Sequence, residues 1–392
     1  MPDSITISAD KKQVLHKLIE WYRHNYQTNA YISVGGYAGT GKTTLIALLR
    51  KIIHKKNPKL KTAFVSYTGK AARVLQQYLK STNSVYPKDF AGTIHSLIYS
   101  PRVDNRGVIV GWDKKDKLDF DLILIDEASM VDYDIWQDML SFNIPIMAFG
   151  DHGQLPPIKG SFSLMASPDL TLETIHRQAQ DNPIIKLSIM ARQTGEVPPG
   201  KYSSTVMKLS QSDWQTQEKL NELIQEYDQD TLILCGYNWT RVELNKNVRQ
   251  ALGIYEDEPQ PGDRVICLRN NHQKGIYNGM LGVIKSINSE DKDWFFAQIE
   301  MDGEADLFEG LIARQQFGAK EPLNFTKQRQ KTVKGDLFDF GYALTVHKAQ
   351  GSQAKRVILL EQRFSQMSDQ EWRRWLYTGV TRAEEELYLV GE

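Results

Sequence analysis

Short apolar runs alternate with longer helical patterns along most of the chain. Seven of these runs are rich in Ile, Val and Leu and show little polar alternation: 30–34, 63–66, 122–125, 144–149, 231–235, 357–360 and 386–390. Strands of this kind are typically buried on both faces, as in a parallel sheet that helices cover. Helical stretches such as 42–54 and 70–80 lie between them. The pattern therefore predicts an α/β fold with βαβ units at both ends of the chain.

The middle of the chain has a different pattern. Between residues 259 and 340 the strand-like runs are shorter and alternate apolar with polar positions. Asn278-Gly279 and Asp302-Gly303 supply the positive φ angles that two-residue hairpins need. We therefore expect a small antiparallel β module inserted into a second α/β domain. Another hairpin is predicted from Tyr99 to Trp112, with its turn at residues 104–107.

Composition narrows the class of protein only slightly. The 392 residues suffice for two or three domains, and 48 Lys and Arg balance 48 Asp and Glu, so net charge neither favours nor excludes a nucleic-acid partner. Cys235 and Cys267 lie in apolar runs and are expected to be buried, reduced thiols. Residues 1–12 lack the apolar core of a signal peptide, and no run approaches the ~20 apolar residues that cross a bilayer. A cytoplasmic protein without a membrane partner is expected.

The sharpest chemical signal is the segment Gly-Tyr-Ala-Gly-Thr-Gly-Lys-Thr at residues 36–43, between a predicted strand and a predicted helix. It fits G-x-x-x-x-G-K-[ST], in which glycines let backbone N–H groups surround a phosphate at a helix N-terminus. Lys42 is expected to reach the β- and γ-phosphates, and Thr43 to hold Mg²⁺. The predicted ligands are therefore ATP and Mg²⁺. The residues expected around ATP in this segment are Gly36, Tyr37, Ala38, Gly39, Thr40, Gly41, Lys42, Thr43 and Thr44.

A pair of carboxylates, Asp126 and Glu127, follows the apolar run 122–125. The carboxyl ends of the strands are where ligands bind in open α/β sheets. We expect Asp126 to bind Mg²⁺ directly or through water, and Glu127 to orient or deprotonate the attacking water. In the same βαβ array as the phosphate-binding segment, the pair predicts nucleotide hydrolysis.

Further motifs follow in a fixed order. Residues 68–72 read Thr-Gly-Lys-Ala-Ala, 92–96 Gly-Thr-Ile-His-Ser, 150–157 Gly-Asp-His-Gly-Gln-Leu-Pro-Pro, 176–178 His-Arg-Gln, 345–352 Thr-Val-His-Lys-Ala-Gln-Gly-Ser and 377–383 Tyr-Thr-Gly-Val-Thr-Arg-Ala. With residues 126–129 as motif II, they resemble motifs Ia, Ib, III, IV, V and VI of the RecD-like helicases of superfamily 1. The resemblance covers nearly the whole chain, and its compact plan is closest to phage helicases of the Dda type.

This resemblance implies an α/β fold of two tandem RecA-like P-loop domains with parallel sheets, plus a small inserted β-hairpin and a small inserted β-barrel-like module. The implied boundaries are 1–175 for domain 1A, with a hairpin insert at about 98–118 as domain 1B. Residues 176–258 and 338–392 would form domain 2A, and 259–337 domain 2B. The hairpin is either the pin that separates strands or a cover for a core edge.

The resemblance also implies roles for individual residues. ATP would lie between the two RecA-like domains, where guanidinium groups meet the γ-phosphate on closure, because they stay charged and bind phosphate through two N–H groups. The implied catalytic residues are Lys42, Glu127, Gln154, Arg177 and Arg382. Of these, Gln154, Arg177 and Arg382 would also contact ATP, as would Gly351 and the adenine-reading Gln13. The metal ligands would be Thr43 and Asp126. The implied DNA track consists of Thr68, Lys70, Thr93, His95, Thr345, His347 and Lys348, although both histidines also suit ordinary helix starts.

The implied activity is that of an ATP-dependent DNA helicase or translocase, which couples hydrolysis to 5′–3′ movement on single-stranded DNA and to unwinding. Expected partners are single-stranded DNA, duplex junctions and replication or recombination proteins, with the chain acting as a monomer. Two alternatives stay open: a small-molecule phosphotransferase, which would have a lid in place of a second domain with Arg382, and an ATP-gated binding protein with little turnover. The residues by themselves determine neither the direction of movement along the strand nor whether the substrate is DNA or RNA.

Overall fold

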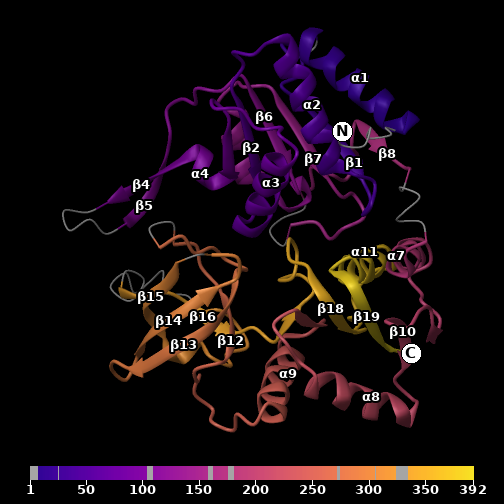
Figure 1. The fold of residues 1–392 in the computed structure, drawn as a ribbon, viewed down its shortest axis with the longest axis vertical. Coiled ribbons are helices and arrows are strands. Elements are labelled where there is room, and N and C mark those ends of the chain that lie inside the picture. Colours follow the sequence, from indigo (N-terminus) through magenta and orange to yellow (C-terminus); the bar gives the residue numbers. More distant parts are fainter. Residues whose placement is uncertain are drawn as a thin grey trace. The chain divides into compact units, whose positions relative to one another are not determined.

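The chain forms two compact units, Met1–Ile185 and Lys186–Glu392, each built on a six-stranded sheet (Figure 1). The structure is a computed structural model that describes residues 8–24, 26–103, 109–157, 162–174, 181–271, 274–304, 306–323 and 334–392. No helix in these ranges is both long and apolar enough to cross a membrane. The boundary between units lies shortly after the sequence-based boundary at residue 175.

Unit 1 is built on the sheet β3-β2-β6-β7-β1-β8, in which every pairing is parallel. Its strands are β1 (Tyr31–Gly36), β2 (Thr62–Ser66), β3 (Phe90–Thr93), β6 (Leu122–Asp126), β7 (Ile146–Gly150) and β8 (Leu170–Leu172). Its helices are α1 (Ala9–His24), α2 (Lys42–Lys56), α3 (Gly69–Ser81), α4 (Ile94–Ile98), the 3₁₀ turn η1 (Ala128–Met130) and α5 (Tyr133–Leu140). The α/β class predicted from the apolar runs is confirmed.

The sheet of unit 1 separates two hydrophobic cores. Leu122 and Leu124 of β6 pack into the core formed with α1, α2 and α3, whereas Ile123 and Ile125 pack into the core formed with α4 and α5. All four side chains are fully buried. Because both faces of the sheet are covered, the strand sequence has no polar alternation.

A hairpin of β4 (Tyr99–Val103) and β5 (Ile109–Lys114) projects from the body of unit 1 (Figure 1). Its strands pair antiparallel, with Tyr99 opposite Lys114 and Pro101 opposite Trp112. The predicted turn at residues 104–107 lies outside the described residues. At the base of the hairpin, β4 continues directly from α4.

Unit 2 contains the sheet β17-β11-β18-β19-β10-β9, which is parallel except for the edge strand β9. Its strands are β9 (Gly200–Lys201), β10 (Val206–Ser210), β11 (Thr231–Cys235), β17 (Ala343–Thr345), β18 (Ala354–Leu360) and β19 (Ala383–Gly391). The associated helices are α7 (Pro183–Gln193), which begins in unit 1, α8 (Trp214–Gln225), α9 (Asn238–Ala251) and α11 (Asp369–Val380). Cys235 and Cys267 are buried free thiols, as predicted.

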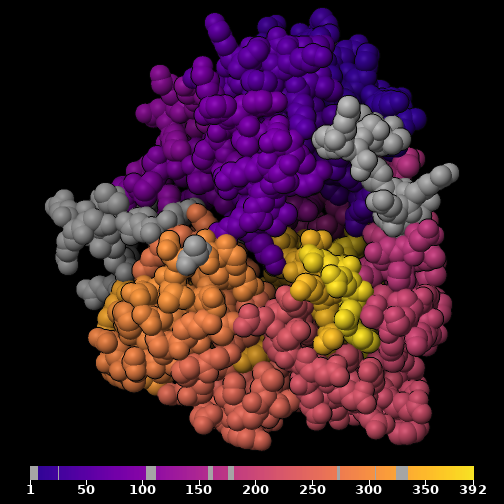
Figure 2. Space-filling model, viewed as in Figure 1, coloured from indigo at the N-terminus to yellow at the C-terminus, as the bar shows by residue number. Residues whose placement is uncertain are grey.

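A second sheet in unit 2 has the antiparallel order β15-β14-β13-β12-β16. Its strands are β12 (Arg264–Cys267), β13 (Leu281–Ser289), β14 (Trp294–Met301), β15 (Leu307–Ala313) and β16 (Phe338–Phe340). A bridge between Ile312 and Asp336 links its two edges, so the sheet curls on itself around a core that includes Phe295, Phe308 and Phe338. Its residues appear as an orange surface in the space-filling view (Figure 2). The sheet includes β16, whereas the sequence-based boundary ended the module at residue 337.

The two dipeptides predicted to form two-residue hairpins do not do so. Gly303 has φ 72°, and the N–H of Glu304 donates to the carbonyl of Met301, yet β15 begins only at Leu307. Gly279 has φ 90°, but residues 268–280 separate β12 from β13. The positive φ angles set local turns, as the residue types require, while the pairing register sets where the strands begin.

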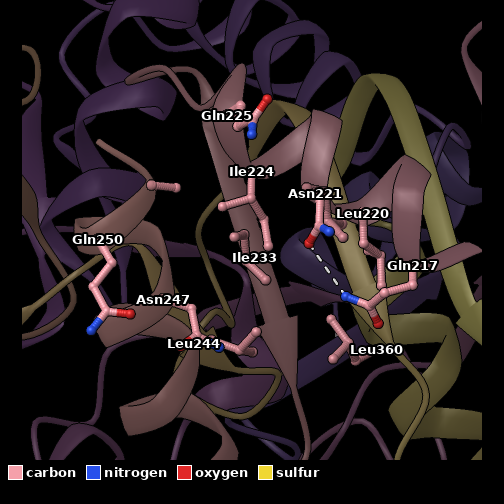
Figure 3. A pocket seen from close by; sticks show the side chains of 12 residues that line it. Gln217, Leu220, Asn221, Ile224, Gln225, Ile233, Leu244, Asn247, Gln250 and Leu360 are labelled. Carbon is pink, nitrogen blue, oxygen red and sulfur yellow. Dashed lines mark hydrogen bonds between the residues drawn. The ribbon is translucent and has the colours of Figure 1, made fainter. Parts of the chain in front are cut away.

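A cavity of 390 Å³ lies between α8 and α9 in unit 2 (Figure 3). Leu220, Ile224 and Leu244 project from these helices over Ile233 of the sheet. At its rim the Gln217 amide donates to Oδ1 of Asn221 at 3.3 Å. None of the site residues predicted from the sequence lines this cavity, so it is separate from the predicted chemistry.

Candidate nucleotide and nucleic-acid sites

The predicted motifs of unit 1 follow the carboxyl ends of parallel strands, so they lie along one edge of the sheet. Strand register places Gly35 beside Gly150, and Ser66 beside both Asp126 and Thr93. The Ser66 hydroxyl donates to the carbonyl of Asp126 at 3.0 Å, which fixes β2 against β6 at this level. Because all these strands are parallel, the loops that carry the phosphate-binding segment and motifs Ia, Ib, II and III begin along the same edge.

The phosphate-binding segment has the backbone that its glycines predict. Gly39 and Gly41 both have φ 78°, in the left-handed region that favours glycine. Gly41 is the N-cap of α2 and has no side chain that could accept from the first N–H groups of the helix. Those donors therefore face the position where a phosphate binds at a helix N-terminus. Lys42 Nζ donates to the carbonyls of Gly36 and Tyr37 at 2.7 and 3.3 Å, so its ammonium lies over the same loop.

Thr43 and Asp126 meet as the predicted metal ligands should. The Thr43 hydroxyl donates to Oδ2 of Asp126 at 3.0 Å. Burial raises the pKa of Asp126, while the Lys42 charge and the Thr43 hydrogen bond oppose that rise. The described residues contain no group of three or more His, Cys, Asp or Glu that could hold a metal. Mg²⁺ needs no such group, because it keeps several waters and takes one or two protein carboxylates beside phosphate oxygens. The hydroxyl and carboxylate oxygens fit that ion.

The residues predicted to activate water and sense the γ-phosphate lie nearby on the same edge. Glu127 follows β6 with φ 55°, and its N–H donates to Oδ1 of Asp126 at 3.0 Å. Gln154 is 6% exposed, and its Nε2 donates to Oδ2 of Asp151 at 3.4 Å. Its Oε1 has no hydrogen-bond partner among the described residues. A buried amide oxygen without a partner is costly, so it suits a site that a ligand or water completes.

Motif III also contacts the phosphate-binding segment, which the sequence did not predict. The His152 ring lies 4.2 Å from the Tyr37 ring, centroid to centroid. Asp151 accepts from both Gly153 N–H and the Gln154 amide, and so holds the short turn that carries Gln154. The spacing Asp-x-x-Gln was visible in the sequence, but only the fold places its turn against residue 37.

The track residues of unit 1 begin two helices. Thr68 is the N-cap of α3 and accepts from Ala71 N–H at 3.3 Å. Thr93 is the N-cap of α4 and forms a capping box with Ser96. Both hydroxyls therefore serve their own helices, and Thr93 is only 5% exposed. Lys70 lies in the first turn of α3 and is half-buried.

His95 lies under the projecting hairpin. Its ring centroid is 4.6 Å from that of Tyr99 in β4 and 4.6 Å from that of Trp112 in β5. The Tyr99 hydroxyl donates to Asp138 of α5. One histidine of motif Ib thus contacts both strands of the hairpin.

In unit 2 the predicted track residues lie at the end of β17, where Thr345 is the last residue, and in the loop that follows it. Thr345 is 7% exposed and accepts from Lys348 N–H at 3.4 Å. Burial lowers the pKa of His347 below its ordinary value, so this ring is neutral at pH 7. Burial also lowers the pKa of Lys348, Arg241 lowers it further, and Asp339 opposes them. The loop therefore presents a neutral imidazole and a lysine that loses its proton more readily than usual.

The other residues predicted to contact ATP are distributed over both units. Arg382 is 4% exposed and donates to the carbonyls of Thr378 and Ser352 and to the Thr381 hydroxyl, at 2.9, 3.2 and 3.1 Å. Gly351 has φ 75° in the motif V loop. Arg177 lies outside the described residues. In unit 1, Gln13 is exposed on α1, and the Thr44 hydroxyl pairs with the Tyr78 hydroxyl at 2.9 Å.

Comparison with known proteins agrees with this arrangement of motifs. An AAA domain family matches residues 22–160, and the UvrD-like helicase C-terminal domain family matches residues 340–390. The ATP-dependent RecD2 DNA helicase of Deinococcus radiodurans is 25% identical over an alignment 379 residues long, gaps included, which covers 91% of this chain and 46% of that protein. The RecBCD enzyme subunit RecD of Buchnera aphidicola is 22% identical over an alignment 463 residues long, gaps included, which covers 96% of this chain and 74% of that protein. Over nearly its whole length, the chain is similar to RecD-like helicases. It spans about half the length of the Deinococcus relative.

The fold of this RecD-like protein is also similar to that of a solved helicase. The crystal structure of Bacteroides Pif1 helicase in complex with ADP-AlF3 and single-stranded DNA matches with TM-score 0.56 and 18% identity. The match covers 98% of this chain and 92% of the Pif1 chain. At this level of identity the likeness concerns the fold, and it includes both units of the RecD-like chain.

Proposed function

We propose that this RecD-like protein is an ATP-dependent DNA helicase that couples ATP hydrolysis to movement on single-stranded DNA and to duplex unwinding. One observation carries the proposal: a single edge of the unit 1 sheet holds both the Thr43–Asp126 pair and the starts of α3 and α4. A nucleotide site and a row of helix starts on the same strands allow the state of the nucleotide to alter the neighbouring loops. The name of the Deinococcus relative and the ligands of the Pif1 structure support ATP and single-stranded DNA as substrates.

The nucleotide chemistry follows from the residues on that edge. The α2 N-terminus and Lys42 bind the phosphates, and Thr43 and Asp126 would hold Mg²⁺, which supplies charge neutralisation at the β- and γ-phosphates. Glu127 orients and deprotonates the attacking water, because it follows the metal-binding carboxylate directly. Gln154 accepts a hydrogen bond from that water through its Oε1, which has no partner among the described residues.

Arginines complete the proposed hydrolytic set. Arg382 acts as an arginine finger and Arg177 as a second phosphate-binding arginine, since guanidinium groups stabilise the charge that develops on transferred phosphate. For this role the Arg382 side chain has to exchange its hydrogen bonds to Ser352 and Thr378 for phosphate oxygens. Gln13 and Gly351 belong to the same proposed ATP site.

The proposed DNA track uses the α3 and α4 starts in unit 1 and the loop after β17 in unit 2. Lys70 and Lys348 supply charge, and backbone N–H groups and His95 and His347 supply hydrogen bonds to phosphates. Hairpin β4–β5 acts as the strand-separating pin. Movement from 5′ to 3′ follows from the resemblance to the RecD-like group. The proposal includes a monomer that works in the cytoplasm at duplex junctions, together with replication or recombination proteins.

Steady-state ATP hydrolysis, with and without a single-stranded DNA oligomer, tests the proposal. We expect DNA to raise turnover strongly, and Lys42→Ala to be inactive in both conditions because it removes the phosphate-binding ammonium. A duplex with a 5′ or a 3′ single-stranded tail then tests unwinding and its direction. If turnover ignores every polynucleotide, the helicase proposal fails, and a phosphotransferase with a small acceptor becomes the better explanation of the nucleotide site.

A further inference from the structure

Three aromatic side chains form a shelf at the carboxyl ends of β11 and β18 in unit 2. The Tyr237 ring stacks with the Trp239 ring at 5.9 Å and meets the Phe364 ring edge-on at 4.5 Å. Trp239 is 53% exposed, whereas the other two are half-buried. Tyr237, Trp239 and Phe364 are called the aromatic shelf below. Two of its members thus support a third, whose ring is largely open to solvent.

Hydrogen bonds fix the backbone that carries the aromatic shelf. Gln362 Oε1 accepts from the N–H groups of Gly236 and Tyr237 at 2.9 and 3.3 Å, and Gln362 Nε2 donates to the Thr240 hydroxyl at 3.0 Å. A side chain at Gly236 would lie 2.8 Å from the Gln362 carbonyl, so the two strand ends are in close contact. A single amide therefore ties the start of α9 to the segment that follows β18, and little ordering remains to be done when a ligand binds.

The aromatic shelf occupies the same topological position in unit 2 as the candidate track in unit 1. The sheets have the parallel orders β3-β2-β6-β7-β1 and β17-β11-β18-β19-β10, and the chain visits the corresponding strands in the same sequence. The start of α9 after β11 thus corresponds to the start of α3 after β2, where Thr68 and Lys70 lie. Likewise, the loop after β17 corresponds to the start of α4 after β3. Unit 2 carries aromatic side chains where unit 1 carries a hydroxyl and an ammonium.

The aromatic shelf adjoins the track residues of its own unit. Cys235 pairs with Thr345, and Val346 N–H donates to the Cys235 carbonyl at 3.0 Å, so the two loops leave neighbouring strands at one level. Lys348 is close enough to Arg241 for their charges to interact, and Arg241, in the first turn of α9, is buried and pairs with Asp339 at 2.8 Å. The loop that carries Lys348 therefore lies next to the start of α9, which carries Trp239.

We infer that the aromatic shelf stacks a base of single-stranded nucleic acid, with Trp239 as the contact face and Tyr237 and Phe364 as its support. A rigid, exposed indole next to the loop that carries Lys348 suits a nucleotide, because every base has a π-face and the Lys348 ammonium can meet a phosphate. Such contact is tolerant of sequence, as a motor on DNA requires. The inference rests on the proposed function and adds a base-binding site to it.

The test uses equilibrium anisotropy with the 392-residue chain. It compares a fluorescein-labelled oligothymidylate with an oligomer of the same length whose internal nucleotides are abasic. We expect Trp239→Ala to weaken binding of oligothymidylate by about 10-fold, which is the scale of one base–aromatic stack. Its affinity for the abasic oligomer should equal that of the wild type. Trp239→Phe, which keeps a π-face, should recover most of the loss. Tyr255→Ala is the matched control, because Tyr255 is 76% exposed in the same unit but lies beyond the far end of α9.

The outcomes separate the inference from the proposed function. Equal weakening on both oligomers would assign Trp239 a structural role and overturn the inference, as would no weakening on either. Loss of binding by Tyr255→Ala to the same extent would also overturn it, since the effect would then not be specific to the shelf. If the wild type binds neither oligomer and its ATPase ignores DNA, both the proposed function and the inference fail.

Discussion

At the scale of single residues, Lys348 gives the proposed DNA track a pH dependence. Burial lowers the pKa of its ammonium, Arg241 lowers it further, and Asp339 opposes them. Only the protonated form attracts phosphate, so affinity for single-stranded DNA should fall as pH rises through this lowered pKa, before ordinary lysines titrate near ~10.4. Measuring the dissociation constant of an oligothymidylate from pH 7 to pH 10 checks this expectation.

Two variants make that measurement specific to Lys348. Lys348→Arg stays charged across the range, so its affinity should remain flat where that of the wild type falls. Lys348→Met should bind weakly at every pH and show no titration in this range. A wild-type fall that persists unchanged in Lys348→Arg would assign the titration to another group.

Residue identity was easier to predict from the sequence than residue orientation. The spacing of the glycines and of Lys42 predicted a phosphate loop, and its left-handed glycines and the Thr43–Asp126 hydrogen bond agree with that geometry. By contrast, the motifs did not lead us to expect that Thr93 caps its own helix or that Arg382 is bonded to carbonyls of its own unit. The Thr93 cap is local, because its partner Ser96 is in the same motif, whereas the bond from Arg382 to the Ser352 carbonyl joins segments that only the packed fold brings together.

At the scale of elements, side chains of α4 and α5 contact the hairpin β4–β5 at its base. His95 contacts Tyr99 and Trp112, and Asp138 of α5 accepts from Tyr99 and from Lys114. Deleting residues 103–108 removes the part beyond this base. If the hairpin is the pin, the deletion should abolish unwinding of a tailed duplex while DNA-stimulated ATP hydrolysis persists, because the nucleotide site and the track keep their supports.

The control for this deletion is a substitution at the base of the hairpin. Trp112→Ala removes one of the two rings around His95 and should weaken both DNA binding and unwinding, since His95 belongs to the proposed track. Equal loss of ATP hydrolysis and unwinding in the 103–108 deletion would instead favour the hairpin as a cover for a core edge.

Element type was predictable wherever both faces of a strand are buried. Runs such as 122–125 carry apolar side chains into two cores, so their composition alone distinguishes them from surface strands. Strand ends and hairpin loops were less predictable. Asp302-Gly303 forms its turn, but Glu300 pairs with Leu307, which leaves a longer loop than the dipeptide indicated.

At the scale of the whole molecule, the two parallel sheets repeat one strand order with different chemistry on it. Unit 1 uses the carboxyl end of β1 for a glycine-rich phosphate loop, whereas in unit 2 the corresponding strand, β10, is followed by α8, whose N-cap Asp213 accepts from Gln215 N–H. An acidic N-cap is a poor phosphate site, since it already occupies the helix donors with a negative charge. Of these two corresponding helix starts, that of α2 therefore suits a phosphate and that of α8 does not, while both units carry candidate contacts for a polynucleotide.

The balance of charge over the whole chain predicts how salt acts on DNA binding. With 48 basic and 48 acidic residues, the molecule has no overall positive field, so electrostatic affinity has to come from a few local cations. The slope of log affinity against log salt for single strands is about 0.7 per phosphate neutralised, so Lys70→Ala and Lys348→Ala should each reduce it by about 0.7. Lys355→Ala serves as the control, because Lys355 pairs with Asp230 at the opposite, amino end of β18. Titrations with oligothymidylate at several salt concentrations measure the slope. A slope that falls equally in all three variants would mean that binding arises from diffuse surface charge and not from the proposed track.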